Sequence, residues 1–239
     1  MLLISILALY GCRSQDGVND FETLRAQFPE PSKEYKTAPL YVWNTKITRG
    51  LIDTTLTDLK EKGFGGVFVH PRPGLVTEYI SDEWYELFRY ALDKGKELDM
   101  NVWIYDENSY PSGFAGGHVP AEMPESYNQG DGLTLEKADM LPGNAAEFFI
   151  CLKEEKGVFV DIAGKLPEEQ GKQGKYYLFK KSYQRTSPWY GGFSYVDLLH
   201  KGVTQKFIEV TFRGYERVAG DEFGKHMPGW FTDEPNINP

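Results

Sequence analysis

The sequence predicts an α/β fold built from parallel strand-helix-strand units. Short apolar runs alternate with longer amphipathic stretches from about residue 39 onward, and this alternation is typical of parallel sheets. Polar or charged side chains follow each apolar run directly. With 239 residues, of which 41% are hydrophobic, the chain is long enough to bury a sizeable core.

Four apolar runs are predicted to be strands, and three amphipathic stretches to be helices. The strands are expected at residues 40–43, 66–69, 102–105 and 229–232. The helices are expected at about 52–63, 82–98 and 204–219, with Ser81 as the N-cap of the second. An open, doubly wound sheet and a closed barrel share this local pattern, so both remain possible on the pattern alone.

The pattern changes between residues 127 and 200, where short strands are predicted instead. Residues 147–152, 157–162 and 175–181 look like short strands, and they are joined by turns rich in Gly, Pro and Lys. We therefore expect a small antiparallel β insertion after the third strand of the α/β fold.

The N-terminus has the layout of a lipoprotein signal peptide. An uninterrupted apolar run at residues 2–10 ends at Gly11-Cys12, so residues 1–12 are expected to be a signal peptide with Cys12 as the lipidated residue. No Lys or Arg precedes the run and Tyr10 replaces a smaller residue, which leaves a buried N-terminal segment as the alternative. Residues 13–38 are expected to form a linker and a loop leading into the fold. The expected location is the bacterial cell envelope, with the membrane reached only through the lipid.

Composition narrows the class of ligand. A formal net charge of −9 argues against a nucleic-acid binder, which needs a basic face. The chain has 15 Tyr, 15 Phe and five Trp, and exposed aromatic rings stack on the apolar faces of sugars, although most aromatic residues belong to cores. The only cysteines, Cys12 and Cys151, are too few for a disulfide framework or a cysteine-ligated zinc.

Candidate functional residues cluster where the predicted strands end. Asn44, Arg72, Glu107 and Glu234 mark the four positions, and ligands of parallel α/β proteins bind at this edge of the sheet. Each cluster also has a structural interpretation: a core Trp43 beside a turn, a His70–Arg72 ion-pair corner, or a capping role for the carboxylates. The adjacent acids Asp233 and Glu234 are the hardest to explain structurally, because they repel each other and are costly to desolvate.

Several of these segments together resemble glycoside hydrolase family 106, which consists largely of α-L-rhamnosidases. The resemblance covers about residues 39–130 and 187–235. It rests on Trp43-Asn44, on the segments 63–72 with Gly74-Leu75 and 103–113, and on Phe231-Thr232-Asp233-Glu234-Pro235.

The resemblance implies a (β/α)8 TIM barrel, of which this chain would hold the first half, with about four strand-helix units. It also implies hydrolysis of rhamnose-containing plant glycans by inversion, with calcium as the cofactor to consider, although the sequence itself requires none. A complete barrel needs about 250 residues and eight strands, so we expect a truncated fragment that is inactive alone. The expected partner is an oligosaccharide or polysaccharide.

In the implied mechanism, one protonated carboxyl donates to the leaving oxygen and a second carboxylate activates water. Glu234 is the candidate acid, with its pKa raised by Asp233; the second carboxylate is expected on a later strand, and Glu107 is the other catalytic candidate. Asp106 and Glu107 would otherwise grip sugar hydroxyls or a hard cation. The candidate substrate-binding residues are Trp43, Asn44, His70, Arg72, Tyr105, Asp106, Tyr110 and Asp233.

The competing hypothesis is a carbohydrate-binding lipoprotein without turnover. A nucleotide-dependent enzyme is disfavoured, because residues 43–46 read Trp-Asn-Thr-Lys where a glycine-rich turn would be required.

Overall fold

A computed structural model describes residues 20–130 and 132–237 of the chain. Its elements form a mixed α/β protein with one parallel and one antiparallel sheet. The helices are α1 (Phe21–Gln27), α2 (Arg49–Glu61), α3 (Asp82–Glu97), α4 (His118–Glu122), α5 (Leu166–Glu169) and α6 (Val203–Ala219). The strands are β1 (Leu40–Trp43), β2 (Gly66–Pro71), β3 (Asn101–Tyr105), β4 (Gly132–Met140), β5 (Ile150–Glu155), β6 (Val158–Asp161), β7 (Gln173–Ser182) and β8 (Trp230–Phe231).

The first sheet is parallel and its strands follow one another in chain order. The order is β1-β2-β3-β8, with Leu40 opposite Phe68 and Phe68 opposite Trp103. β8 joins the far side of β3 with Tyr105 opposite Phe231. All four carboxyl ends therefore lie at the same edge of the sheet, as the sequence predicts.

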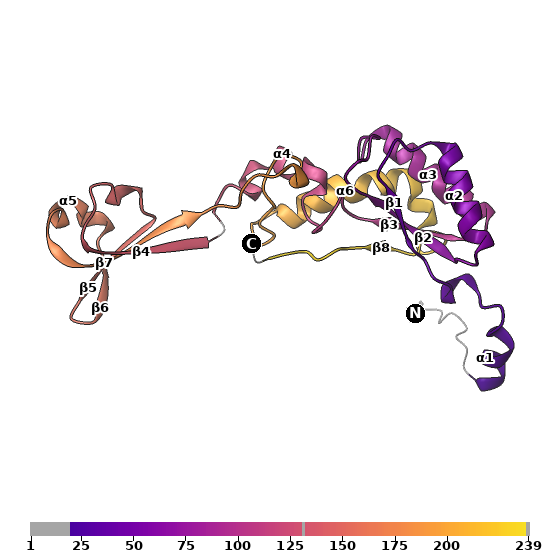
Figure 1. Ribbon diagram of the computed structural model, residues 1–239, viewed down its shortest axis with the longest axis horizontal. Helices are drawn as coiled ribbons and strands as arrows, with labels where there is room; N and C mark the ends of the chain where they lie inside the picture. Colours follow the sequence, from indigo (N-terminus) through magenta and orange to yellow (C-terminus); the bar gives the residue numbers. More distant parts are fainter. Residues whose placement is uncertain (1–19, 131, 238–239) are drawn as a thin grey trace, which may run out of the picture.

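The two faces of this sheet have different surroundings. Tyr41 and Trp43 point into the main core, which they share with residues of α2, α3 and α6. Figure 1 shows these three helices together on one side of the sheet. The alternate side chains face the opposite way, and Leu40, Val42 and Phe231 among them are exposed. No described helix covers this second face, which we call the open face.

Helix α3 begins where the sequence predicts. The Ser81 side chain accepts a hydrogen bond from the Trp84 N–H at 3.2 Å, so it caps the first turn. Asp82 and Glu83 follow in that turn and Lys94 and Lys96 occupy the last one, an arrangement that suits the helix dipole. The buried side of the helix carries large aromatic side chains that contact α6 and the sheet, including Trp84, Tyr85 and Phe88.

The second sheet is antiparallel, in the order β4-β7-β5-β6, and corresponds to the predicted insertion. It has a separate core that includes Cys151, Tyr176 and Leu178, and it lies well away from the parallel sheet (Figure 1). Strand β4 was not predicted. Most of its residues are exposed, so its burial pattern is weak, and it is a strand because it pairs with β7.

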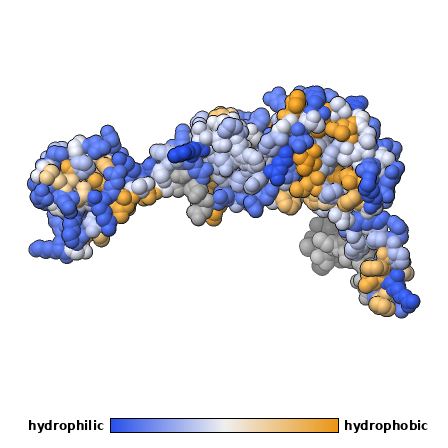
Figure 2. All heavy atoms as spheres, viewed as in Figure 1, coloured by the Kyte–Doolittle hydropathy of each residue, from blue (hydrophilic) through white to orange (hydrophobic). Residues whose placement is uncertain are grey.

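The N-terminal part of the described chain differs from the linker predicted there. Residues 21–27 form helix α1, because the Asp20 side chain caps it by accepting from the Thr23 N–H at 2.8 Å. Its apolar side chains Phe21 and Leu24, and the adjoining Phe28, are exposed, and Figure 2 shows this apolar surface at the end of the molecule. The predicted signal peptide and Cys12 lie outside the described residues. Within residues 20–130 and 132–237, none of the helices has the length and apolar character needed to span a bilayer.

Candidate active site at the strand ends

His70 occupies the centre of the strand-end edge and is fully buried. Its ring lies against the Tyr105 ring, with 3.6 Å between centroids and 33° between planes. Neither ring nitrogen has a hydrogen-bond partner among the described residues. Burial, reinforced by the nearby Arg72 and opposed by Asp233, lowers the pKa of His70 to about 4. The imidazole is therefore neutral at neutral pH.

Tyr105 connects β3 to β8. Its hydroxyl donates a short hydrogen bond to the Asp233 carboxylate, and its ring stacks on Phe231 at 5.5 Å and 13°. Burial, followed by the bond to Asp233, raises the pKa of the Tyr105 phenol, so the phenol remains a donor. The Asp233 N–H donates to the Ser112 hydroxyl at 2.8 Å. These contacts hold Asp233 at the same edge as His70.

A second group at this edge surrounds Tyr110. The Arg72 guanidinium lies over the Tyr110 ring, 5.1 Å from its centroid. Trp189 meets the same ring edge-on at 5.3 Å and 86°, and its indole N–H donates to the Tyr110 carbonyl at 2.5 Å. Trp189 directly follows none of the predicted strands, so the strand-end pattern does not predict it. The Ser-Pro-Trp-Tyr-Gly-Gly segment at 187–192, a turn with two adjacent aromatics, is the signal that could have found it.

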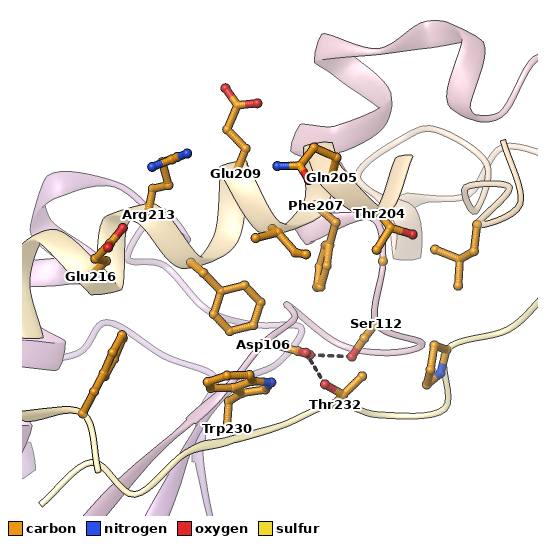
Figure 3. A pocket seen from close by; sticks show the side chains of 16 residues that line it. Asp106, Ser112, Thr204, Gln205, Phe207, Glu209, Arg213, Glu216, Trp230 and Thr232 are labelled. Carbon is orange, nitrogen blue, oxygen red and sulfur yellow. Dashed lines mark hydrogen bonds between the residues drawn. The ribbon is translucent and has the colours of Figure 1, made fainter. Parts of the chain in front are cut away.

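Asp106 faces the helical side of the sheet instead. Its carboxylate accepts from the Ser112 hydroxyl at 2.5 Å and from the Thr232 hydroxyl at 2.6 Å. It lines a groove of about 700 Å³ between α6 and the 229–235 segment, with Phe207, Phe212 and Trp230 nearby (Figure 3). Burial raises the pKa of Asp106 to about 6, although both hydroxyl bonds oppose the change. Asp106 and Tyr105 therefore point to opposite faces of the sheet.

The structure corrects the prediction that Glu107 is catalytic, because a substrate cannot reach its side chain. It is fully buried, and its two oxygens accept five backbone N–H bonds, from Asn108, Gly113, Phe114, Ala115 and Gly116. Burial raises the pKa of Glu107 to about 8, although the N–H bonds from Gly116, Ala115, Asn108 and Gly113 oppose the change. All five partners are backbone donors, and together they fix both oxygens of the Glu107 side chain in place. Glu107 therefore shapes the 108–116 loop rather than supplying a catalytic group.

The structure also corrects the prediction that Trp43 binds a sugar, but it leaves Asn44 accessible. Trp43 is fully buried and packs edge-on against Trp84 at 4.9 Å and 69°, so it cannot stack on a sugar. The strand pleat turns the ring toward α3, and the core interpretation of this residue holds. Asn44 is exposed at the end of β1 and stays available as a binding residue.

Glu234 is exposed and forms no hydrogen bond or ion pair within the described part of the chain. Its backbone adopts a left-handed conformation, with φ of 42°, which is unusual for a residue with a side chain. Strain of this kind is found most often at functional sites. The Glu234 side chain can therefore reach a ligand without breaking an existing contact.

The structure thus brings His70, Arg72, Tyr105, Tyr110 and Asp233 to one edge, with Asn44 and Glu234 at its ends. It removes Trp43, Asp106 and Glu107 from direct contact with a ligand there. Within residues 20–130 and 132–237, no three His, Cys, Asp or Glu side chains form a metal-binding group.

Comparisons with known proteins find a distant structural likeness. No family model matches the chain, and no curated protein matches it. Among solved structures, the chain is similar to a rhamnosidase from Novosphingobium sp. PP1Y, with a TM-score of 0.38 and 23% identity. This likeness covers 50% of the present chain and 12% of the rhamnosidase.

Proposed function

We propose that this chain supplies the first four strands of a (β/α)8 catalytic barrel, in a glycoside hydrolase that acts on rhamnose-containing glycans. The observation that carries the proposal is the form of the parallel sheet. Its strands follow in chain order, and helices α2, α3 and α6 all pack on one face.

This arrangement favours a barrel over a doubly wound sheet. A doubly wound sheet reverses its strand order at one point and carries helices on both faces. In a barrel, sequential strands curve around a shared interior and every helix lies outside. The open face would then be the barrel interior, and the edge with His70, Tyr105 and Asp233 would be its active-site mouth.

The residues at that edge suit the two-carboxylate mechanism in distinct roles. Glu234 is the proposed general acid, which protonates the leaving oxygen as the glycosidic bond breaks. The Asp233 carboxylate, which the Tyr105 hydroxyl holds in place, would bind hydroxyl groups of the sugar, and the fully buried His70 and Tyr105 would support it from behind. The carboxylate that activates water would come from a later strand of the barrel.

A binding protein without turnover is the second candidate, and one observation favours it. Asp106 points to the other face of the sheet, and Glu107 is held by backbone N–H groups. Asp233 and Glu234 are therefore the carboxylates that the four described strand ends present at the strand-end edge. Adjacent residues of one strand end cannot flank a sugar from opposite faces, as an inverting hydrolase requires.

The test measures binding and turnover separately. Saturation-transfer NMR with methyl α-L-rhamnopyranoside should detect binding that Asp233→Asn weakens and that Asp58→Asn, on exposed α2, leaves unchanged. Release of 4-nitrophenol from the aryl α-L-rhamnoside reports turnover. In a form that turns over, Glu234→Gln should lower the rate by roughly 10² to 10⁴, and by more on a natural glycan than on the aryl substrate. Absence of binding to any rhamnoside would contradict the proposal, and binding without turnover would favour the second candidate.

We also propose that Cys12 carries lipid and holds the protein at the cell envelope. The support is the apolar run that ends at Gly11-Cys12. Mass spectrometry of the membrane fraction should find a mature chain that begins at lipidated Cys12. An unmodified chain that begins at Met1 would end this proposal.

A further inference from the structure

We propose that Arg72, Tyr110 and Trp189 form a subsite for a sugar ring that carries a carboxylate, such as a hexuronate. The proposal rests on the proposed function, because it names the kind of sugar unit that would lie next to the cleaved rhamnose in the glycan. We call these three residues the cation-aromatic corner.

The two aromatic rings provide the surface for a pyranose. Tyr110 and Trp189 meet at 86°, and each keeps more than a third of its surface exposed, at 37% and 36%. The Trp189 indole is fixed by its hydrogen bond to the Tyr110 carbonyl. Two fixed rings at a right angle can contact one face and one side of a sugar, and fixed rings lose little entropy when they bind.

Arg72 supplies the charge. It is half-buried, and the described arginine ion pairs are those of Arg89 and Arg217, so the Arg72 guanidinium is without a carboxylate partner in this part of the chain. The cation–π contact with the Tyr110 ring holds the guanidinium at this edge. A guanidinium held in this way is suited to a bidentate bond with a carboxylate.

None of the described groups around Arg72 forms an ion pair with it. His70 beside Arg72 is buried, and its ring nitrogens lack partners among the described residues. The nearby Asp233 accepts the Tyr105 hydroxyl, and it lies in no ion pair with Arg72 among the described residues. A free cation next to exposed aromatic rings, in a protein of net charge −9, favours a ligand that combines an anion with a ring. A neutral sugar would use the rings and leave the guanidinium unpaired.

The β insertion delivers one of the three residues. Trp189 lies where the chain returns from β7, in a short turn at Pro188–Tyr190. The Ser187 hydroxyl accepts from the Trp189 N–H at 3.2 Å, and the Ser187 N–H donates to the Phe193 carbonyl at 2.8 Å. The turn therefore fixes Trp189 locally, and a change in this return segment would change the subsite without altering the parallel sheet.

The test compares two sugars that differ only in the carboxylate. The full chain is titrated with methyl α-D-galactopyranosiduronate and with methyl α-D-galactopyranoside, and the NMR signal of the Trp189 indole N–H is followed. The Trp189→Phe variant assigns this signal. We expect the uronate to bind about tenfold more tightly, since a hydrogen bond to a charged group is stronger than a neutral one.

Variants then separate charge from stacking. Arg72→Gln should abolish the preference for the uronate, so that both sugars bind about equally well, because the charge-assisted bond is removed. Trp189→Ala should weaken both sugars. Arg213→Gln, which removes the same charge from an exposed position of α6, is the matched control and should keep the preference. Equal binding of the two sugars by the natural chain, or an equal loss of preference in the Arg213 variant, would overturn the inference. Preference for the uronate without any rhamnoside binding would contradict the proposed function, but it would support the cation-aromatic corner as a uronate subsite.

Discussion

At the scale of single residues, the neighbours Asp106 and Glu107 show how position decides the fate of a carboxylate. Asp106 continues the pleat of β3 and so points to the side opposite Tyr105, where two hydroxyl groups hold it. Glu107 lies one residue further and turns into the 108–116 loop, whose N–H groups surround it. One acid thus ties β3 to β8 and the other organises a loop. Neither faces the proposed sugar site.

Replacing Glu107 with Gln should destabilise the protein strongly. The amide places an NH2 group against backbone donors and leaves buried N–H groups without an acceptor. We expect a loss of about 2 to 5 kcal/mol in the free energy of unfolding, measured by urea denaturation. Glu86→Gln, on the exposed side of α3, is the control and should change stability by less than about 0.5 kcal/mol. A Glu107→Gln protein as stable as this control would contradict the anchoring role.

Asp106 should make stability depend on pH in a defined window. Its pKa is raised in the folded protein to about 6, above the unfolded value of about 3.9. The protonated form is therefore favoured by folding. Its contribution is complete below about pH 4 and is lost as the pH rises through about 6, by up to about 3 kcal/mol.

The Asp106→Asn variant isolates this contribution, because the amide mimics the neutral acid. The difference in unfolding free energy between the natural chain and the variant should fall between pH 4 and pH 6 and then become constant. Denaturation curves at several pH values give this difference. A difference that stays constant from pH 3 to pH 8 would show that Asp106 titrates normally.

At the scale of elements, the contact between α3 and α6 fixes the helical layer over the sheet. The Trp84 indole N–H donates to the Tyr215 hydroxyl at 3.0 Å, and both residues are fully buried. The Tyr85 ring passes directly over Gly214 of α6, where an added Cβ would lie 1.9 Å from the ring. Glycine is therefore required at this point of the helix by the close approach of Tyr85.

Gly214→Ala should destabilise the protein even though alanine is the better helix former. The propensity gain is about 1 kcal/mol, whereas the overlap with Tyr85 forces the helices apart at a cost of about 1 to 3 kcal/mol or more. Gly220→Ala is the matched control, since its Cβ would meet its nearest neighbour at an ordinary 3.7 Å. Thermal unfolding should show a lower midpoint for the first variant and little change for the second. A higher midpoint for Gly214→Ala would mean that Tyr85 moves aside freely.

The elements also show what the sequence could predict. The core strands β1, β2 and β3 and helices α3 and α6 were predicted to within a few residues, because burial of one side imposes a regular apolar pattern. Strand β4 was missed, since it is exposed and owes its form to a distant partner. The strand-end edge was predicted, but not the face on which each side chain lies. That depends on the pleat beyond the strand and on a loop closed by long-range N–H bonds, as Glu107 shows.

At the scale of the whole molecule, the described residues form three hydrophobic clusters, which are the main core, a second cluster around Phe114, Tyr195 and Phe207, and the core of the antiparallel sheet. The parallel sheet and its helices share the main core, whereas the antiparallel sheet packs around Tyr176 and Leu178. The tryptophans, at positions 43, 84, 103, 189 and 230, all lie outside the antiparallel sheet, which spans residues 132–182. Tryptophan fluorescence therefore reports on the part of the protein outside the antiparallel sheet.

Tyr176→Ala should unfold the insertion without unfolding the parallel sheet. Tyr176 is fully buried in the insertion core, and truncation of a buried aromatic residue costs about 3 to 5 kcal/mol. The far-UV circular dichroism transition should become earlier and broader, while the fluorescence transition stays in place. Phe88→Ala, in the main core, should have the reverse effect and shift the fluorescence. Coincident shifts of both signals in the Tyr176 variant would indicate a single cooperative unit.

The separation of the insertion from the parallel sheet (Figure 1) also affects how the protein behaves on a column. An elongated molecule experiences more friction than a sphere of equal mass, so a 27.3 kDa chain of this outline should elute earlier from a size-exclusion resin than a compact standard. Its elution volume would then resemble that of a compact dimer. Light scattering and sedimentation equilibrium measure molar mass independently of molecular shape, so these methods give the true mass.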